Sequence, residues 1–139
     1  MIQNFYNIQV QTTGQNLYEF TSDIIKWIEI NNFKNGIINV SIQHTSASLI
    51  IQENADPDVK KDLLNFFNKL VPMDSSLYVH STEGNDDMPA HIKSSITNNQ
   101  ISISVKNGQM LLGTWQGVYL FEHRLNLQNR NIILHYLGD

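Results

Sequence analysis

The chain has 139 residues, 41% of them hydrophobic and 16% charged, so it can bury one core and is too apolar to be disordered. Its formal net charge is -4 and no basic cluster occurs, which argues against nucleic acid as a partner. There is no cysteine, so a metal ion would need His, Asp, Glu or water as ligands. Without a leader-like start or an apolar run of membrane-spanning length, we expect a cytoplasmic protein without membrane contact.

The spacing of apolar residues predicts the elements of the first half. Strands are predicted over residues 2–11, 17–20, 37–44 and 47–51, with a surface helix over 21–32. In the third of these strands Ile38, Val40 and Ile42 share one face, and His44 is next in that row. We therefore expect the His44 side chain to point inward.

The second half starts with a clear helix signal, because Asp56 can cap a helix that has Pro57 at its first position and ends before Pro72. Strands are predicted over residues 77–80, 101–105, 110–112, 118–123 and 132–137, with one helical turn over 91–96. Residues 81–89 are predicted to be irregular. Together these elements predict a single α+β domain over residues 1–139, with a bent, largely antiparallel sheet or sandwich and two main helices.

Three histidines fall at the predicted ends of different elements. His44 and His80 end strands, and His91 begins a helical turn. Three imidazoles of this kind can form one face of a site for Zn²⁺ or a similar ion and leave positions for water or substrate. Taken alone, however, His44 is better explained as a buried histidine bonded to a backbone carbonyl.

Acidic residues offer proton carriers near these histidines. Glu83, Asp86 and Asp87 form either a solvated loop or a group in which one carboxylate orients a metal-bound histidine or accepts a proton from water. Asp56 is explained by its capping role, but Glu53 has no such structural explanation. Glu53 and Glu83 are therefore candidate proton carriers.

The segment GTWQG, residues 113–117, interrupts a predicted hairpin strand. Trp115 offers a stacking face and Gln116 an amide that can recognise the edge of a heterocycle. The alternative is a β-bulge with a core tryptophan. The following Glu122-His123-Arg124 ends a strand, where an acid and a base are commonly a surface salt bridge.

Three stretches, HTSASLIIQENADPDV, EGNDDMPAHIKSSI and LLGTWQGVYLFEHR, occur in this order. Together they resemble the YjbQ-like family, small proteins named as secondary thiamine-phosphate synthases, over nearly the whole chain. The resemblance implies a compact α+β fold, a homotrimer, and a polar pocket of histidines with a divalent metal ion, zinc or magnesium. It assigns function to His44, Glu53, His80, His91, Lys93, Trp115, Gln116 and Glu122.

The first hypothesis is thus an enzyme acting on a small molecule. The metal ligands would be His44, His80 and His91; the catalytic groups Glu53, Glu83, Lys93 and Glu122; and the substrate contacts Asn85, Trp115 and Gln116. The family name implies joining a pyrimidine methyl diphosphate to a thiazole phosphate. Because the departing diphosphate needs cations or glycine-rich backbone donors, which this chain has in small number, two alternatives remain open. They are a metal-dependent hydrolase of a small phosphorylated or amide compound, and a non-catalytic trimeric ligand-binding module.

Overall fold

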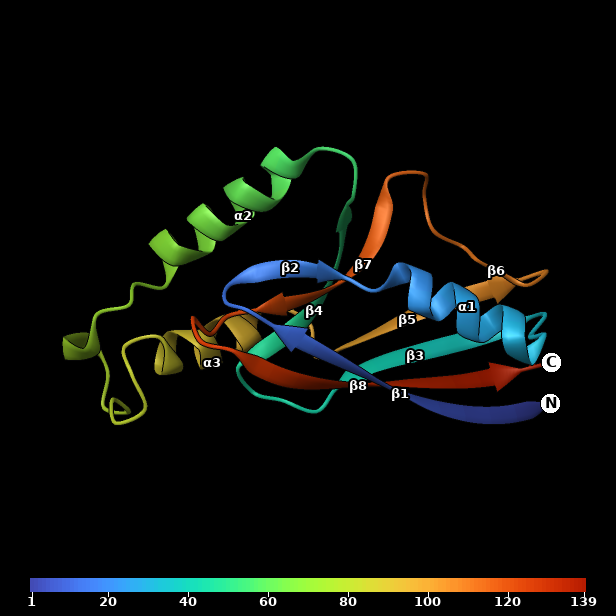
Figure 1. The fold of residues 1–139 in the computed structure, drawn as a ribbon, viewed down its shortest axis with the longest axis horizontal. Coiled ribbons are helices and arrows are strands. Elements are labelled where there is room, and N and C mark those ends of the chain that lie inside the picture. Colours follow the sequence, from blue (N-terminus) through green and yellow to red (C-terminus); the bar gives the residue numbers. More distant parts are fainter.

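The computed structural model describes residues 1–139 and contains eight strands and three α-helices (Figure 1). In chain order the elements are β1 Ile2–Thr12, β2 Asn16–Glu19, α1 Thr21–Asn31, β3 Gly36–Ile42, β4 Ala47–Glu53, α2 Pro57–Leu70, a 3₁₀ turn Ser75–Leu77, α3 Asp87–Ile96, β5 Gln100–Lys106, β6 Gln109–Met110, β7 Gln116–Glu122 and β8 Gln128–Gly138. The predicted α+β class is confirmed, with a third helix that the sequence did not reveal at full length.

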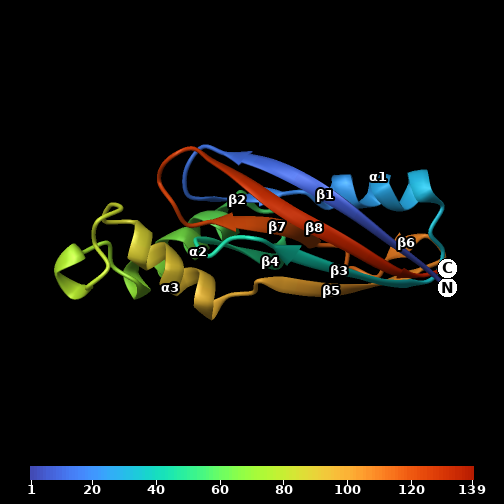
Figure 2. The same cartoon turned by 90° about the horizontal axis from the view of Figure 1, so that it is seen from below.

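The strands form two antiparallel sheets that share one hydrophobic core. The first sheet has the order β1-β8-β3-β5-β6 and the second the order β2-β7-β4. Alternate residues of β3, among them Ile38 and Val40, point into this core, where they meet Leu120 of β7 and Trp27 of α1. Figure 2 shows α1 beside the β1 end of the first sheet and α3 at the opposite end of the molecule.

The segment between β6 and β7 corrects the sequence-based expectation. A hairpin strand interrupted at GTWQG was predicted, with a β-bulge as the alternative, but residues 111–115 form no strand and carry the chain from the first sheet to the second. The Gln116 side chain closes this turn by accepting the N–H of Gly113 at 2.7 Å. Trp115 is 63% exposed and is therefore no core residue.

The three helices differ in how deeply they are buried. In α2 the cap forms as predicted, since Asp56 accepts the N–H of Asp58 at 2.9 Å. None of the residues of α2 is fully buried, and Figure 1 shows this helix standing away from the body of the molecule. Its contact with the second sheet is aromatic, with the rings of Phe67 and Phe121 edge to face at 5.3 Å. None of the helices is long and apolar enough to cross a membrane.

Residues 77–89 differ most from the prediction. The strand expected over 77–80 is absent, and Ser75–Leu77 forms a 3₁₀ turn instead. The stretch 81–89 was expected to be irregular throughout, but α3 already begins at Asp87. Pro89 lies in the first turn of this helix, where its missing N–H breaks no intrahelical bond.

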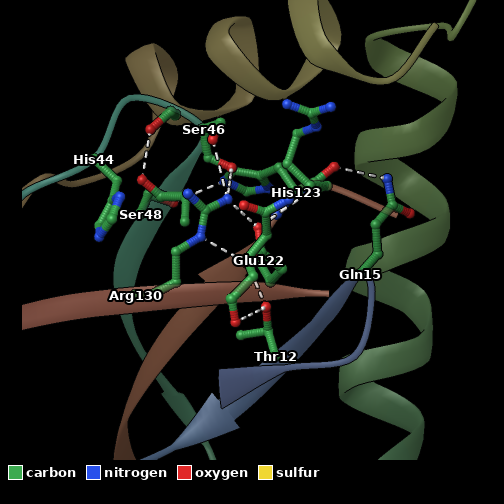
Figure 3. A network of polar contacts seen from close by, with 12 residues as sticks. Thr12, Gln15, His44, Ser46, Ser48, Glu122, His123 and Arg130 are labelled. Atoms are coloured by element: carbon green, nitrogen blue, oxygen red, sulfur yellow. Dashed lines mark hydrogen bonds and ion pairs between the residues drawn. The ribbon is translucent and has the colours of Figure 1, made fainter. Parts of the chain in front are cut away.

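A buried ion pair joins the two sheets beside α3 (Figure 3). Glu122 lies at the end of β7. Its carboxylate accepts hydrogen bonds from Nε and Nη2 of Arg130 in β8, at 2.7 and 2.6 Å. Thr12 donates to the same carboxylate at 2.6 Å, and the N–H groups of His123 and Arg124 donate at 3.0 and 3.1 Å. Glu122 and Arg130 are 0% and 3% exposed, so the whole carboxylate is satisfied by protein groups.

His123 adds a second buried polar group next to this ion pair. Its Nε2 lies 2.8 Å from the hydroxyl of Ser48, which in turn accepts a hydrogen bond from Thr97 at 2.7 Å. Burial, followed by the charges of Lys93 and Arg130, lowers the pKa of His123 from 6.5 to about 3. The folded protein therefore keeps this imidazole neutral at every pH near neutrality.

Replacing Arg130 tests the ion pair. Arg130→Met leaves the buried Glu122 charge without its partner and is expected to lower the free energy of unfolding by about 3–5 kcal/mol, measured by urea denaturation. The double variant Glu122→Gln with Arg130→Met buries no charge and should recover part of this loss. A double variant as unstable as the single one contradicts the assignment.

A second stability prediction concerns pH. Below about pH 6.5 the unfolded chain protonates His123 while the folded chain does not until about pH 3, so stability falls as the pH falls through this window. Between pH 7 and pH 5 this single group should cost about 2 kcal/mol. His123→Gln keeps a hydrogen-bonding side chain and removes the titration. Its pH 7 to pH 5 loss, measured by urea denaturation, should be smaller by that amount, and an unchanged loss argues against the assignment.

Candidate metal centre

Three side chains converge at the N-terminus of α3. His80, Asp87 and His91 each offer one ligand atom, and these three atoms lie within 4.8 Å of one another. Asp87 Oδ2 is 2.6 Å from His80 Nε2 and 3.2 Å from His91 Nε2. The carboxylate is 3% exposed, whereas the side chains of His80 and His91 are 44% and 29% exposed. The group is thus anchored on a buried acid and opens to solvent through its histidines.

Local structure explains why these residues meet. Asp87 and His91 are four residues apart on α3, so they lie on the same face of the helix. The preceding loop turns back toward this face at Gly84, which has a φ of +107°. A Cβ at Gly84 would stand 2.9 Å from Asp86 Oδ1, so both the backbone conformation and the space require glycine.

Arg124 holds the loop in place from the turn after β7. Its Nε donates to Asp86 Oδ2 at 2.9 Å, its Nη1 donates to Asp87 Oδ1, and its Nη2 donates to the carbonyl of Glu83 at 3.0 Å. The N–H of Leu125 adds a bond to Asp86 at 2.9 Å. One guanidinium therefore fixes both acids and the loop that carries His80.

The two oxygens of Asp87 have separate partners. Oδ1 faces Arg124 and Oδ2 faces the two histidines. Burial alone would raise the pKa of Asp87, but the hydrogen bond from His80 and the charges of Arg124 and His91 outweigh it and hold this pKa below its usual range. Asp87 is thus ionised at neutral pH and has one oxygen available to a cation.

The orientation of His91 is set by a backbone carbonyl. His91 Nδ1 donates to the carbonyl oxygen of Thr45 at 2.8 Å. In the neutral ring this leaves Nε2 unprotonated, and this nitrogen lies 3.2 Å from Asp87 Oδ2 without a hydrogen bond between them. His91 can therefore offer Nε2 to a cation while the Thr45 carbonyl holds the ring in place.

His44 does not join this cluster. Its Nε2 accepts the backbone N–H of Asn131 at 2.8 Å, which occupies the lone pair that a metal ion would need. The ring is half-buried and lies at the end of β3, near the carbonyl of Thr45 that binds His91. The structure brings His44 and His91 to one polar pocket, but as neighbours with different bonding partners.

Lys93 and Glu122 also lie outside the cluster. Lys93 is 3% exposed, and its ammonium group donates to Asn68 of α2 at 2.6 Å. Burial lowers the pKa of Lys93, opposed by the charge of Asp86. Glu122 accepts five hydrogen bonds in the buried ion pair, which leaves it no free site for proton transfer. We therefore assign both residues to the framework that positions α3 and Arg124.

Three other predicted site residues lie at the far end of the second sheet. In the β4–β7 pairing Ala47 is opposite Glu122, next to α3, whereas Glu53 is opposite Gln116. Six residue steps along a strand separate these two ends by roughly 20 Å. Within one chain, Glu53, Gln116 and the adjacent Trp115 therefore cannot reach the histidine cluster.

The remaining loop residues are closer to the cluster. Glu83 Oε2 lies 3.5 Å from His80 Nε2 and its side chain is 63% exposed. Asn85 is exposed in the same loop between Gly84 and Asp86. Sequence reasoning gave Asp87 only a minor part, because the segment was taken as irregular. The spacing Asp-x-x-x-His, read as two positions of one helix, is the signal that identifies Asp87.

Fold and site together define a small α+β domain with a histidine–carboxylate cluster at one end of its sheets. The model of the family described as UPF0047 protein YjbQ-like matches residues 6–139. The chain therefore belongs to the YjbQ-like family, as its sequence motifs predicted.

Individual relatives agree with this membership. A UPF0047 protein of Synechocystis is 51% identical over 94% of this chain and 88% of its own length. The UPF0047 protein YjbQ of Escherichia coli O157:H7 is 45% identical over 75% of both chains. A crystal structure of a YjbQ/UPF0047 family protein from Clostridium acetobutylicum superposes with a TM-score of 0.86 at 29% identity, covering 95% of this chain and 99% of the other.

The clamp by Arg124 gives a testable prediction. Arg124→Ala removes charge-assisted hydrogen bonds from Asp86, Asp87 and the Glu83 carbonyl, so the loop should open more often. We expect the amides of residues 83–88 to exchange with deuterium faster by at least about tenfold, since each such bond contributes about 1.5–3 kcal/mol. Lys61→Ala, which removes an exposed ion pair with Asp58, is the control and should leave these rates unchanged. Equal exchange in all three proteins contradicts the clamp.

Proposed function

We propose that this protein is a metal-dependent enzyme whose divalent ion is held by His80, Asp87 and His91. One observation carries the proposal: three ligand atoms of suitable type lie within 4.8 Å of one another at the solvent-facing end of α3. The orientation of His91 supports it, because the Thr45 carbonyl binds Nδ1 and leaves Nε2, 3.2 Å from Asp87 Oδ2, free for a metal ion.

The spacing of the donor atoms fits a small ion. Around a tetrahedral Zn²⁺ with bonds of about 2.0–2.1 Å, neighbouring ligand atoms are about 3.4 Å apart. The separations of 2.6 and 3.2 Å at Asp87 Oδ2 therefore require only a small outward movement of His80. Since the His80 side chain is 44% exposed on a loop, this movement meets little packing resistance.

The chemistry of the donor set favours zinc or a similar transition metal over magnesium. Two imidazole nitrogens and one carboxylate oxygen suit Zn²⁺, whereas Mg²⁺ prefers oxygen ligands and retains its waters. The hydrogen-bond partners of the proposed ligands suit a metal site as well. The Thr45 carbonyl orients His91, and Arg124 binds Oδ1 of Asp87. Glu83, Asp86 and Asp87 outnumber Arg124 among nearby charges, so the local field attracts cations.

Hydrolysis of a small phosphorylated or amide compound is the reaction that this site supports best. A bound Zn²⁺ with three protein ligands supplies activation of water near neutral pH. Glu83 is the proposed proton carrier, because its carboxylate lies 3.5 Å from His80 Nε2 and is open to solvent. Asn85 of the same loop is a candidate substrate contact.

The thiamine-phosphate synthase reaction implied by the family resemblance has weaker support at this site. A departing diphosphate needs free positive charge, but the Arg124 guanidinium is engaged by Glu83, Asp86 and Asp87. Lys93 is buried and bonded to Asn68. An assay of phosphate release without the thiazole partner separates the two reactions, and metal uptake without any turnover would favour the non-catalytic binding module.

The homotrimer is likewise a proposal taken from the resemblance. Its support is the outer face of the first sheet, which no helix covers and where Phe5, Ile37 and Leu137 are 61%, 52% and 45% exposed. Assembly of copies could also bring Glu53, Trp115 and Gln116 of one chain to the cluster of another. Light scattering after gel filtration measures the number of copies.

Metal titration tests the proposed function directly. Calorimetric titration of the metal-free protein with Zn²⁺ should show one ion bound per chain. Asp87→Asn and His91→Gln should each weaken binding by more than about 100-fold, beyond the loss typical of a supporting residue. His135→Gln is the matched control. Because His135 stacks on Phe5 at the outer face of the first sheet, this substitution should leave the Zn²⁺ affinity unchanged. A wild-type protein that takes up no Zn²⁺ removes the proposal.

A further inference from the structure

A small polar pocket lies next to the histidine cluster. It has a volume of about 210 Å³ and lies between α3 and the segment that follows β3. Its lining is entirely polar: His44, Thr45, His91, Ser94, Ser95 and Asn99. A larger hollow of about 550 Å³ lies between β1 and α1 and has no histidine in its lining. The small pocket alone shares a residue, His91, with the proposed metal centre.

The tautomer of His44 is fixed by the backbone. Because the N–H of Asn131 donates to Nε2 at 2.8 Å, Nε2 cannot carry a proton, and the proton of the neutral ring is on Nδ1. Burial, followed by the charge of Arg130, lowers the pKa of His44, with Glu122 opposing. No acceptor within the chain bonds Nδ1, so His44 offers one free N–H in a half-buried position.

The other groups of the pocket are mostly acceptors. The hydroxyl proton of Ser94 is given to the carbonyl of Ala47 at 2.7 Å, and that of Ser95 to the carbonyl of Ile92 at 2.7 Å. These bonds leave the oxygen lone pairs of both serines available to a ligand. The Nδ1 proton of His91 is engaged by Thr45 in the same way.

The lining of the pocket carries no Lys or Arg. None of its six residues carries a formal charge while His44 and His91 are neutral, and the nearby Arg130 directs Nε and Nη2 at Glu122 and Ser46. In the metal-free chain a phosphate or carboxylate placed here would meet serine lone pairs and no Lys or Arg of the lining, at a cost in desolvation. A neutral group with both an acceptor and a donor matches the lining.

We infer that this pocket is a subsite for a neutral carboxamide, with the Nδ1–H of His44 donating to the amide oxygen and the serine oxygens accepting its N–H. As a substrate subsite it rests on the proposed metal centre and selects amides over phosphorylated compounds. In the hydrolysis, water forms the new C–O bond, the C–N bond breaks, and one proton of the water goes to the departing nitrogen. The carboxylate product is an anion, which the uncharged pocket binds weakly and releases.

The test uses small probes on the full-length, metal-free chain labelled with ¹⁵N. Acetamide, acetate and inorganic phosphate are titrated separately, and the backbone amides of Thr45, Ser95 and Asn131 report on the pocket by their NMR shifts. Acetamide is expected to shift these amides and to saturate, while acetate and phosphate leave them in place. His44→Phe should weaken acetamide binding about fivefold, the value of one hydrogen bond. His44→Gln can still accept from Asn131 and donate to the probe, so it should bind within about twofold of the wild type.

The outcomes separate this inference from the metal proposal. Acetamide binding in a protein that takes up no Zn²⁺ keeps the subsite and removes the metal centre. Zn²⁺ uptake without acetamide-dependent shifts overturns the subsite. Tighter binding of phosphate or acetate at the same three amides also overturns it, as does acetamide binding that is equal in the wild type and in His44→Phe.

Discussion

The ion pair between Glu122 and Arg130 is the interaction on which the architecture of the site depends. It joins the end of β7 to the start of β8, and so connects the two sheets through interior strands of both. Because Glu122 also accepts the backbone N–H of Arg124, the direction in which the chain leaves β7 is set by a buried charge. Such a pair contributes little net stability compared with apolar packing, but it tolerates few alternative arrangements of its partners. Its value here lies in the placement of Arg124.

Arg124 in turn positions the residues of the histidine cluster. The guanidinium binds Asp86 and Asp87, and Asp87 presents its second oxygen to His80 and His91. Each step moves from a buried group to a more exposed one, and His80 is the most exposed of the three proposed ligands. The proposed site thus combines a buried, hydrogen-bonded carboxylate, Asp87, with an exposed ligand, His80.

The sequence predicted the regular elements well where the apolar period was unambiguous. The strands along β1, β3 and β8 and the capped helix α2 follow directly from spacing and from the Asp-Pro signal. The family was recognised from its motifs and is confirmed by the match over residues 6–139. His80 and His91 were predicted as partners, and they do lie in one cluster.

Other features depend on tertiary structure and could not be obtained from local patterns. Asp87 was undervalued because glycine and proline nearby suggested a loop, whereas in the folded chain α3 begins at Asp87 and Arg124 binds this residue. His44 matched the ligand type, but only the position of the Asn131 N–H decides which of its nitrogens is free. Glu53 and Gln116 share motifs with the cluster residues, yet the antiparallel register of β4 and β7 places them at the other end of the sheet.

The weak packing of α2 against the rest of the domain affects Lys93. This lysine is held away from water beneath a helix that has no fully buried residue of its own, and its ammonium group is bonded to that helix through Asn68. When α2 lifts, the ammonium regains its hydration, which partly compensates for the lost aromatic contact. A substitution that detaches α2 would therefore expose a cation as well as aromatic surface.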